Sequence, residues 1–218
     1  MSLRHFTTND IGTIYCVGRN YAAHAKELNN PIPSEPVIFT KTRSTACALS
    51  GEIAIPSALN RCDHETEIAI RLGQDLFEAS AEQVLAAISH YGIGLDLTLR
   101  EKQTELKQKS YPWDLAKSFI NATPLSGMLP FNADKTVNLE DIDFSLSING
   151  EIRQQGNTSN MLFSIINLTQ FLSQRIPLQA GDLILTGTPE GVGPVNHNDQ
   201  LVLSLNGETV AEATIVRA

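Results

Sequence analysis

Two segments in the middle of the chain alternate apolar and polar positions, which is typical of β-strands with one buried face. In residues 65–72, one face carries Thr66, Ile68, Ile70 and Leu72. In residues 91–99, one face carries Ile93, Leu95, Leu97 and Leu99. We predict a strand in each segment.

Shorter patterns supply the remaining elements. Strands are predicted at residues 14–17, 37–39, 53–55 and 182–186. Hairpins are predicted where Asn-Gly turns at Asn149 and Asn206 join short alternating runs. Helices are expected at 21–28, at 159–172 and from a capping box at Ser80 to about residue 90. Strands dominate and helices follow irregularly, so the order favours an α+β fold around a large mixed β-sheet. No linker or repeat is visible, and a single domain over residues 1–218 is expected.

The composition narrows the class of protein. With 42% apolar and 18% charged residues, the 218-residue chain resembles ordinary globular proteins. No stretch approaches the roughly 20 apolar residues of a membrane span, and the N-terminus lacks a signal-peptide core. Three scattered cysteines (Cys16, Cys47 and Cys62) fit a reducing compartment. A cytoplasmic protein without membrane or nucleic-acid partners is expected, because a net charge of −8 leaves no basic stripe for phosphates.

Three carboxylates are candidate metal ligands. Glu65 and Glu67 share one face of the first predicted strand, and Asp96 is the only charge in the second. An acid within a Leu-rich strand is costly to bury without a partner. Oxygen ligands favour Mg²⁺, Mn²⁺ or Ca²⁺ over zinc. The alternative for the glutamates alone is a solvated strand edge, and His64 has the opposite strand parity, so it is not counted as a ligand.

A histidine and a glutamate form a candidate catalytic pair. His24 precedes Glu27 by three residues, so the two side chains can touch if residues 21–28 are helical. A histidine oriented by a carboxylate can activate water near neutral pH. The alternative is a surface ion pair. Because Pro31, Pro33 and Pro36 follow, we expect residues 21–36 to form a weakly anchored lid that carries the base.

Cations and a glycine-rich loop complete the candidates. Arg100 and Gln103 follow Asp96 at i+4 and i+7, and Lys117 is a lone cation in a semi-apolar stretch. The loop at residues 187–193 is predicted to offer backbone N–H groups and the Thr188 hydroxyl to an anion. It carries no nucleotide-binding motif and no Gly-x-Ser-x-Gly nucleophile turn.

These features follow one another in a specific order along the chain. The ordered strings are Cys16-Val-Gly-Arg19-Asn-Tyr-Ala-Ala-His24, Glu35-Pro-Val-Ile-Phe-Thr-Lys41, His64-Glu-Thr-Glu67, Leu95-Asp-Leu-Thr-Leu-Arg100, Ala116-Lys-Ser-Phe119, Asn149-Gly-Glu-Ile-Arg-Gln154 and Leu185-Thr-Gly-Thr-Pro-Glu-Gly-Val-Gly193. From about residue 14 to the C-terminus, the chain closely resembles the fumarylacetoacetate hydrolase family. It is most similar to the short acylpyruvate hydrolase branch.

The resemblance implies a mixed β-sheet folded on itself with a few peripheral helices, and a homodimer. It implies Mg²⁺ or Mn²⁺ on Glu65, Glu67 and Asp96, which Ca²⁺ could replace in a crystal, with His24, Glu27 and Lys117 as catalytic residues. Substrate contacts are implied for Arg19, Lys41, Arg100, Gln103, Gln154 and Thr188. Thr42 and Glu101 depart from the family's usual proline and aspartate, which can alter the shape of the pocket.

The function expected from this resemblance is hydrolysis of a C–C bond in a small anionic 2,4-dioxo acid, such as an acylpyruvate or fumarylpyruvate. The products would be pyruvate and a carboxylic acid. An oxaloacetate decarboxylase or a 2-hydroxyhepta-2,4-diene-1,7-dioate isomerase would use the same metal-bound enolate. A non-catalytic metal-binding scaffold is the alternative of another class.

Overall fold

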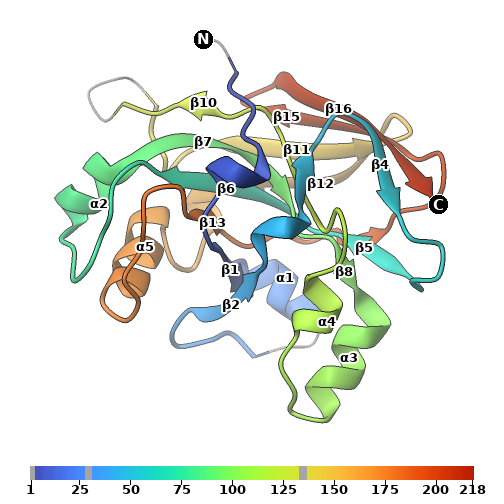
Figure 1. The fold of residues 1–218 in the computed structure, drawn as a ribbon, viewed down its shortest axis with the longest axis horizontal. Helices are drawn as coiled ribbons and strands as arrows, with labels where there is room; N and C mark the ends of the chain where they lie inside the picture. Colours follow the sequence, from blue (N-terminus) through green and yellow to red (C-terminus); the bar gives the residue numbers. More distant parts are fainter. Residues whose placement is uncertain (1–2, 28–30, 133–136) are drawn as a thin grey trace.

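The computed structural model describes residues 3–27, 31–132 and 137–218 (Figure 1). The strands are β1 (Ile14–Gly18), β2 (Val37–Lys41), β3 (Ala46–Ala48), β4 (Gly51–Ile55), β5 (Cys62–His64), β6 (Thr66–Leu72), β7 (Ile88–Leu95), β8 (Thr98–Leu99), β9 (Thr123–Leu125), β10 (Leu129–Pro130), β11 (Asp143–Ile148), β12 (Glu151–Asn157), β13 (Leu183–Leu185), β14 (Gly193–Pro194), β15 (Gln200–Leu205) and β16 (Glu208–Arg217). The α-helices are α1 (Ala22–Glu27), α2 (Ala81–Ala87), α3 (Arg100–Gln108), α4 (Asp114–Lys117) and α5 (Ile165–Ser173). Short 3₁₀ helices lie at Thr8–Asp10, Arg43–Thr45 and Thr158–Asn160.

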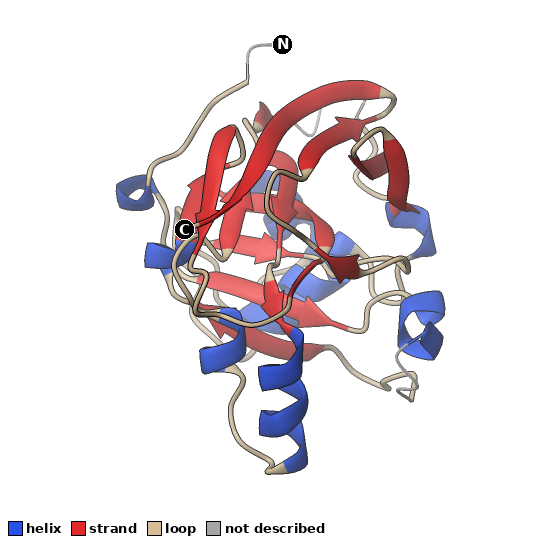
Figure 2. Ribbon diagram, turned by 90° about the vertical axis from the view of Figure 1, so that its right-hand side faces the viewer, coloured by secondary structure: helices blue, strands red, loops and turns tan. Residues whose placement is uncertain are grey.

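The strands form mixed sheets that curl around a common interior (Figure 2). The eight-stranded sheet has the order β2-β1-β13-β6-β7-β9-β3, with β10 beside β7. A five-stranded sheet has the order β12-β11-β15-β16-β4, and a small sheet has the order β14-β5-β8. In both larger sheets parallel pairs stand beside antiparallel ones. The predicted α+β fold with a large mixed sheet folded on itself is therefore confirmed.

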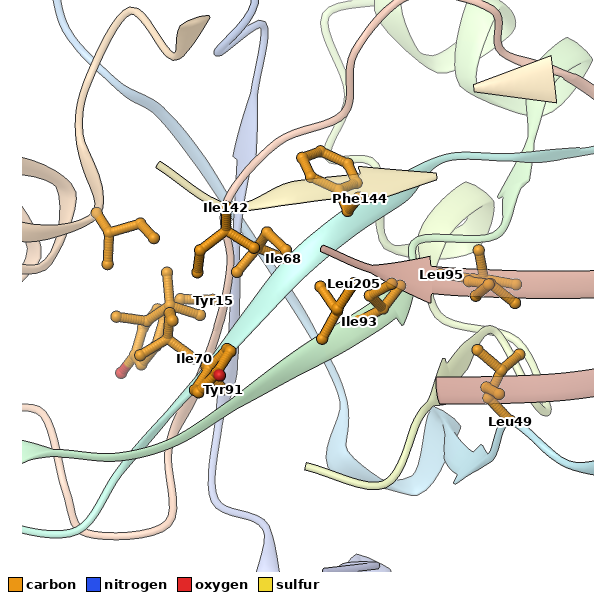
Figure 3. Packing of buried hydrophobic residues seen from close by; sticks show 14 of the residues in the cluster. Tyr15, Leu49, Ile68, Ile70, Tyr91, Ile93, Leu95, Ile142, Phe144 and Leu205 are labelled. Atoms are coloured by element: carbon orange, nitrogen blue, oxygen red, sulfur yellow. The ribbon is translucent and has the colours of Figure 1, made fainter. Parts of the chain in front are cut away.

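The main core lies between β6 and β7 of the large sheet and β11 and β15 of the five-stranded sheet (Figure 3). Its buried side chains include Ile68, Ile70, Ile93, Leu95, Phe144 and Leu205. The predicted apolar faces of both central segments thus point into the core. The opposite face of β6 is buried as well, because Ala69 packs in a second cluster with side chains of β1 and β13.

Tight turns and caps follow the local sequence. Asn149 and Asn206 have φ of 54° and 47°, and each is followed by a glycine with positive φ. This is the backbone of a type I′ turn, so both predicted hairpins are confirmed. The Ser80 side chain caps α2 by accepting the N–H of Gln83, as the capping box predicts.

Two helices are shorter than predicted because tertiary pairing overrides the local pattern. α2 ends at Ala87, and Ile88 already begins β7, where it pairs with Leu72. Residues 161–163 are not helical. The N–H groups of Leu162 and Phe163 donate to Asn20, and α5 begins only after the cap at Ser164.

The segment expected to form a lid is partly packed. α1 ends at Glu27, and residues 28–30, including Leu28, lie outside the described part of the chain. Tyr21, His24 and Ala25 are at most 5% exposed. The start of this segment is therefore anchored in the protein, contrary to the expectation of a weakly held lid.

Among the described residues, no helix is long and apolar enough to cross a membrane.

Candidate metal centre and active site

Pairing along β6 and β7 brings the three predicted metal ligands together. The Asp96 N–H donates to the Glu65 carbonyl at 2.8 Å, and the register places Gly94 opposite Glu67. The side chains of Glu65, Glu67 and Asp96 each offer an oxygen within 4.8 Å of the others. All three residues are buried, so the alternative of a solvated strand edge is wrong.

The electrostatics of these carboxylates fit a bound cation. Burial, followed by the charges of Asp96 and Glu65, raises the pKa of Glu67 well above its ordinary value. Glu67 Oε2 accepts the Gly187 N–H at 2.7 Å, which fixes the direction of the carboxylate. Three buried oxygen donors suit Mg²⁺ or Mn²⁺, whose positive charge would relieve the repulsion between them. The donor set therefore fits the divalent metal that the sequence predicts.

Lys117 lies directly against two of the three carboxylates. Its ammonium donates to Glu65 Oε2 at 2.8 Å and to Asp96 Oδ2 at 2.5 Å. A third bond of 2.7 Å goes to the Thr98 hydroxyl. Burial lowers the pKa of Lys117, but Asp96 and Glu65 outweigh burial and raise it above its ordinary value. Lys117 is therefore a permanent positive charge at the triad.

Lys41 supports Asp96 from the other side. Its ammonium donates to Asp96 Oδ1 at 2.6 Å, and to the carbonyls of Leu97 at 3.2 Å and Ala122 at 2.7 Å. These three bonds use all three N–H groups of the ammonium. Lys41 and Lys117 thus bring two positive charges to three carboxylates.

Arg100, the first residue of α3, is held in one orientation by three neighbours. Its guanidinium donates to Asp63 Oδ2 at 2.9 Å, Glu65 Oε1 at 2.5 Å and Gln103 Oε1 at 2.7 Å. Burial lowers the pKa of Arg100, but Glu65 and Asp63 more than compensate and raise it. Two of its five N–H groups remain for an anion.

The predicted His24–Glu27 pair is formed. His24 Nδ1 lies 3.1 Å from Glu27 Oε2, and Glu27 Oε1 accepts the Gly191 N–H at 3.0 Å. A carboxylate can only accept, so Nδ1 of His24 carries the proton and Nε2 is left as a base. His24 is 5% exposed and the Glu27 side chain is 33% exposed, so the histidine of the pair lies inside the protein and its carboxylate lies at the surface.

Several of these groups line one small pocket, to which β1 and β2 contribute Val17 and Phe39. In Figure 1, α1, α3 and α4 lie beside these two strands. The cavity volume of the pocket is about 40 Å³, which is enough to hold ordered water molecules. The lining residues are Val17, Gly18, Arg19, His24, Phe39, Glu65, Glu67, Arg100, Gln103, Lys107, Trp113, Lys117 and Thr188.

Arg19 enters this pocket from a strained backbone. Its φ is 62°, a left-handed conformation that costs a non-glycine residue roughly 1–2 kcal/mol. The next residue, Asn20, is fully buried and exchanges hydrogen bonds with the backbone of Phe163 and Thr186. Gly187 completes the close packing, because a Cβ there would lie 2.6 Å from the Cβ of Asn20. These contacts of Asn20 and Gly187 hold Arg19 in place at the end of β1.

The sequence matches the fumarylacetoacetate (FAA) hydrolase C-terminal family over residues 13–216. The chain belongs to this family. It is 43% identical over 200 residues to the oxaloacetate tautomerase YcgM of Escherichia coli (strain K12), covering 92% of this chain and 91% of that protein. The family resemblance expected from the ordered motifs is therefore confirmed.

Solved structures of the fumarylacetoacetate hydrolase family have the same fold. A putative fumarylacetoacetate isomerase/hydrolase from Oleispira antarctica superimposes with a TM-score of 0.90 at 46% identity, over 94% of each chain. The fumarylpyruvate hydrolase from Pseudomonas aeruginosa, in complex with Mn²⁺ and pyruvate, superimposes with a TM-score of 0.88 at 30% identity. That match covers 95% of this chain and 91% of the other.

Two of the residues predicted to contact substrate do not line the pocket. Arg19, Arg100, Gln103 and Thr188 line the pocket, whereas Lys41 and Gln154 do not. Gln154 is 1% exposed; its amide oxygen accepts from His64 Nδ1 and from the Thr66 N–H, and its nitrogen donates to the Thr188 hydroxyl. Lys41 and Gln154 therefore position other residues of the site.

The glycine-rich loop holds the protein's own carboxylates. The N–H groups of Gly187 and Gly191 donate to Glu67 and Glu27, and the Thr188 hydroxyl donates to the Thr66 carbonyl. The Gly187 and Gly191 N–H groups and the Thr188 hydroxyl are therefore not directed at a bound anion, because partners far away in the sequence already occupy them.

Several residues of the site were not foreseen. Asp63 is 1% exposed and orients Arg100, and Thr98 orients Lys117. Asp63 precedes Glu65 by two residues and has the same strand parity as both glutamates. Extending the alternating pattern of residues 65–72 toward the N-terminus by two positions would therefore have identified Asp63. No local pattern marks Asn20 or Lys107, whose importance depends on contacts made by the folded chain.

Proposed function

We propose that this protein is a divalent-metal-dependent oxaloacetate tautomerase, which interconverts the keto and enol forms of a 2-oxo dicarboxylic acid. The observation that carries the proposal is the YcgM relationship, which spans nine-tenths of both chains. The pocket supports it, since Glu65 and Glu67 of the carboxylate triad, the cation Lys117 and the base His24 all line it. A non-catalytic scaffold would have no need for an oriented base beside a metal site.

The chemistry follows from the positions of the side chains. A bound cation would polarise the 2-oxo carbonyl and neutralise charge on its oxygen. Arg100 keeps two N–H groups with which to orient the carboxylate next to that carbonyl. His24, held by Glu27, takes the proton from C3 and passes a proton to the enolate oxygen, which gives the enol; in the reverse direction the enol oxygen loses its proton and His24 returns one to C3. Lys117 adds a positive charge that favours the enolate.

The test follows the ultraviolet absorbance of enol-oxaloacetate after protein loaded with Mn²⁺ is added. We expect the enol to decay faster than in buffer containing the same Mn²⁺, and the acceleration to be lost in His24→Ala. Pyruvate release measured in parallel separates decarboxylation from tautomerisation. An unchanged rate of enol decay would refute the proposal.

Hydrolysis of acylpyruvates, the function first expected from the motifs, is the second candidate. It is favoured by the likeness to the fumarylpyruvate hydrolase and by a dyad able to activate water. Efficient pyruvate release from acetylpyruvate or fumarylpyruvate, without effect on enol-oxaloacetate, would select it.

A homodimer and a cytoplasmic location stay predictions.

A further inference from the structure

Besides Lys117, three cationic side chains line the pocket that contains Glu65 and Glu67 of the carboxylate triad: Arg19, Arg100 and Lys107. Arg100 is bound to Asp63 and Glu65 at the inner end. Burial, then the like charges of Arg19 and Arg100, lower the pKa of Lys107. Because Lys107 lines the same pocket as both arginines, an anion bound among the three side chains would lie in a field of positive charge.

The helix α3 places two of these cations at different depths. Arg100, Gln103 and Lys107 follow one another at i, i+3 and i+7, and all three line the pocket. A rise of 1.5 Å per residue puts the backbone of Lys107 about 10 Å beyond that of Arg100. Side chains on a helix tilt toward its N-terminus, so the Cα–Cβ bond of the exposed Lys107 is directed toward the Arg100 end of the helix.

Arg19 reaches the same pocket from a different element. It lies directly after β1, in the left-handed conformation imposed next to the buried Asn20. A strained residue persists where the surrounding structure holds it, and such residues cluster at functional sites. The pocket thus has one cation, Arg100, bound to the metal ligand Glu65, and two further cations, Arg19 and Lys107, from separate elements.

We infer that Lys107 and Arg19 form a subsite for the second carboxylate of a 2-oxo dicarboxylic acid, and that Lys107 determines specificity for diacids. This inference rests on the proposed function. The 2-oxo acid end of the substrate lies at the triad and Arg100. The far carboxylate of a four-carbon diacid then lies toward the mouth, between Lys107 and Arg19.

The experiment compares oxaloacetate with 2-oxobutanoate, which has a methyl group in place of the second carboxylate. Lys107→Met keeps most of the aliphatic stem and removes the charge, and Lys107→Arg restores a charge. Lys109→Met is the matched control, because Lys109 is exposed at the end of the same helix and pairs with Glu105. Tautomerisation of oxaloacetate and deuterium exchange at C3 of 2-oxobutanoate give kcat and KM for each variant loaded with Mn²⁺.

We expect Lys107→Met to lower kcat/KM for oxaloacetate relative to 2-oxobutanoate about tenfold, mainly through KM, as for loss of one charge-assisted hydrogen bond. Lys107→Arg should recover most of this ratio, and Lys109→Met should leave it unchanged. Equal effects on both substrates, or no effect on either, would overturn the subsite.

Calorimetric titration of the same two acids into the Mn²⁺-loaded variants separates the two proposals. If the wild type does not tautomerise oxaloacetate but Lys107→Met weakens its binding selectively, the proposed function fails and the subsite stands. If tautomerisation is observed but the ratio of the two dissociation constants is unchanged by Lys107→Met, the subsite fails and the proposed function stands.

Discussion

Replacing Lys41 with methionine removes a positive charge that is fully buried behind the carboxylate triad. Its side chain is 0% exposed, and its three N–H groups bind Asp96, Leu97 and Ala122. Methionine has nearly the length of the lysine stem, so the substitution removes the charge and the donors while creating little cavity. Asp96 keeps Lys117 as its remaining cation.

The expected loss of stability is large. Removing one partner of a buried ion pair costs about 3–5 kcal/mol, because the other charge stays buried without compensation. In a protein of this size, 1 kcal/mol lowers Tm by about 2–4 °C. A loss of about 4 kcal/mol therefore corresponds to a decrease in Tm of roughly 8–16 °C. Affinity for Mn²⁺ should fall too, since Lys41 no longer holds Asp96 Oδ1 in the orientation that it has in the triad.

The assay combines thermal unfolding of the metal-free protein, titration with Mn²⁺, and steady-state kinetics at saturating metal. We expect a lower Tm and weaker Mn²⁺ binding for Lys41→Met, with KM for oxaloacetate changed less than threefold. Lys109→Met, on the exposed surface, is the control for loss of a lysine charge. The opposite pattern, an unchanged Tm with a KM raised tenfold or more, would show that Lys41 contacts substrate, as the motifs alone suggest.

Four further outcomes follow from the site and the core. Asp96→Asn should weaken Mn²⁺ binding at least tenfold in calorimetry and abolish stabilisation by the metal, because it removes an anionic ligand. His24→Ala should lower kcat by about 10²–10⁴-fold with oxalate binding nearly intact, and Glu27→Gln should lose less. Because the pKa of Glu67 is raised in the metal-free protein, metal binding displaces a proton and affinity rises with pH; calorimetry in buffers of different ionisation heats should detect this release, and equal heats would contradict it. Phe144→Ala should cost about 3–5 kcal/mol in denaturant unfolding without altering metal affinity.

Much of the candidate site could be predicted from residue types and spacing. Strand parity placed Glu65 and Glu67 on one face, and the apolar neighbours of Asp96 in residues 91–99 indicated a buried acid, although the predicted strand is interrupted at Asp96, between β7 and β8. The pairing of His24 with Glu27 is an i, i+3 contact within one helix. Each of these inferences needs only the geometry of a single element or of two adjacent strands.

The roles of the lysines could not be inferred in this way. Lys41 and Lys117 bind Asp96 across 55 and 21 residues of sequence. Whether a lysine faces substrate or a carboxylate depends on which side of the sheet its strand or helix lies. The motif that contains Lys41 therefore predicted its presence at the site but not its position behind Asp96.

The sequence by itself determined the local elements: alternating strands, Asn-Gly hairpins and the Ser80 cap. These depend on backbone conformation and side-chain periodicity within a few residues. Only the tertiary structure decided where helices stopped against strands, which cations neutralise the triad, and that Gly187 holds Glu67 from 120 residues away. Such contacts are chosen by sheet register and by the need to satisfy buried charges, and both exist only once the chain has folded.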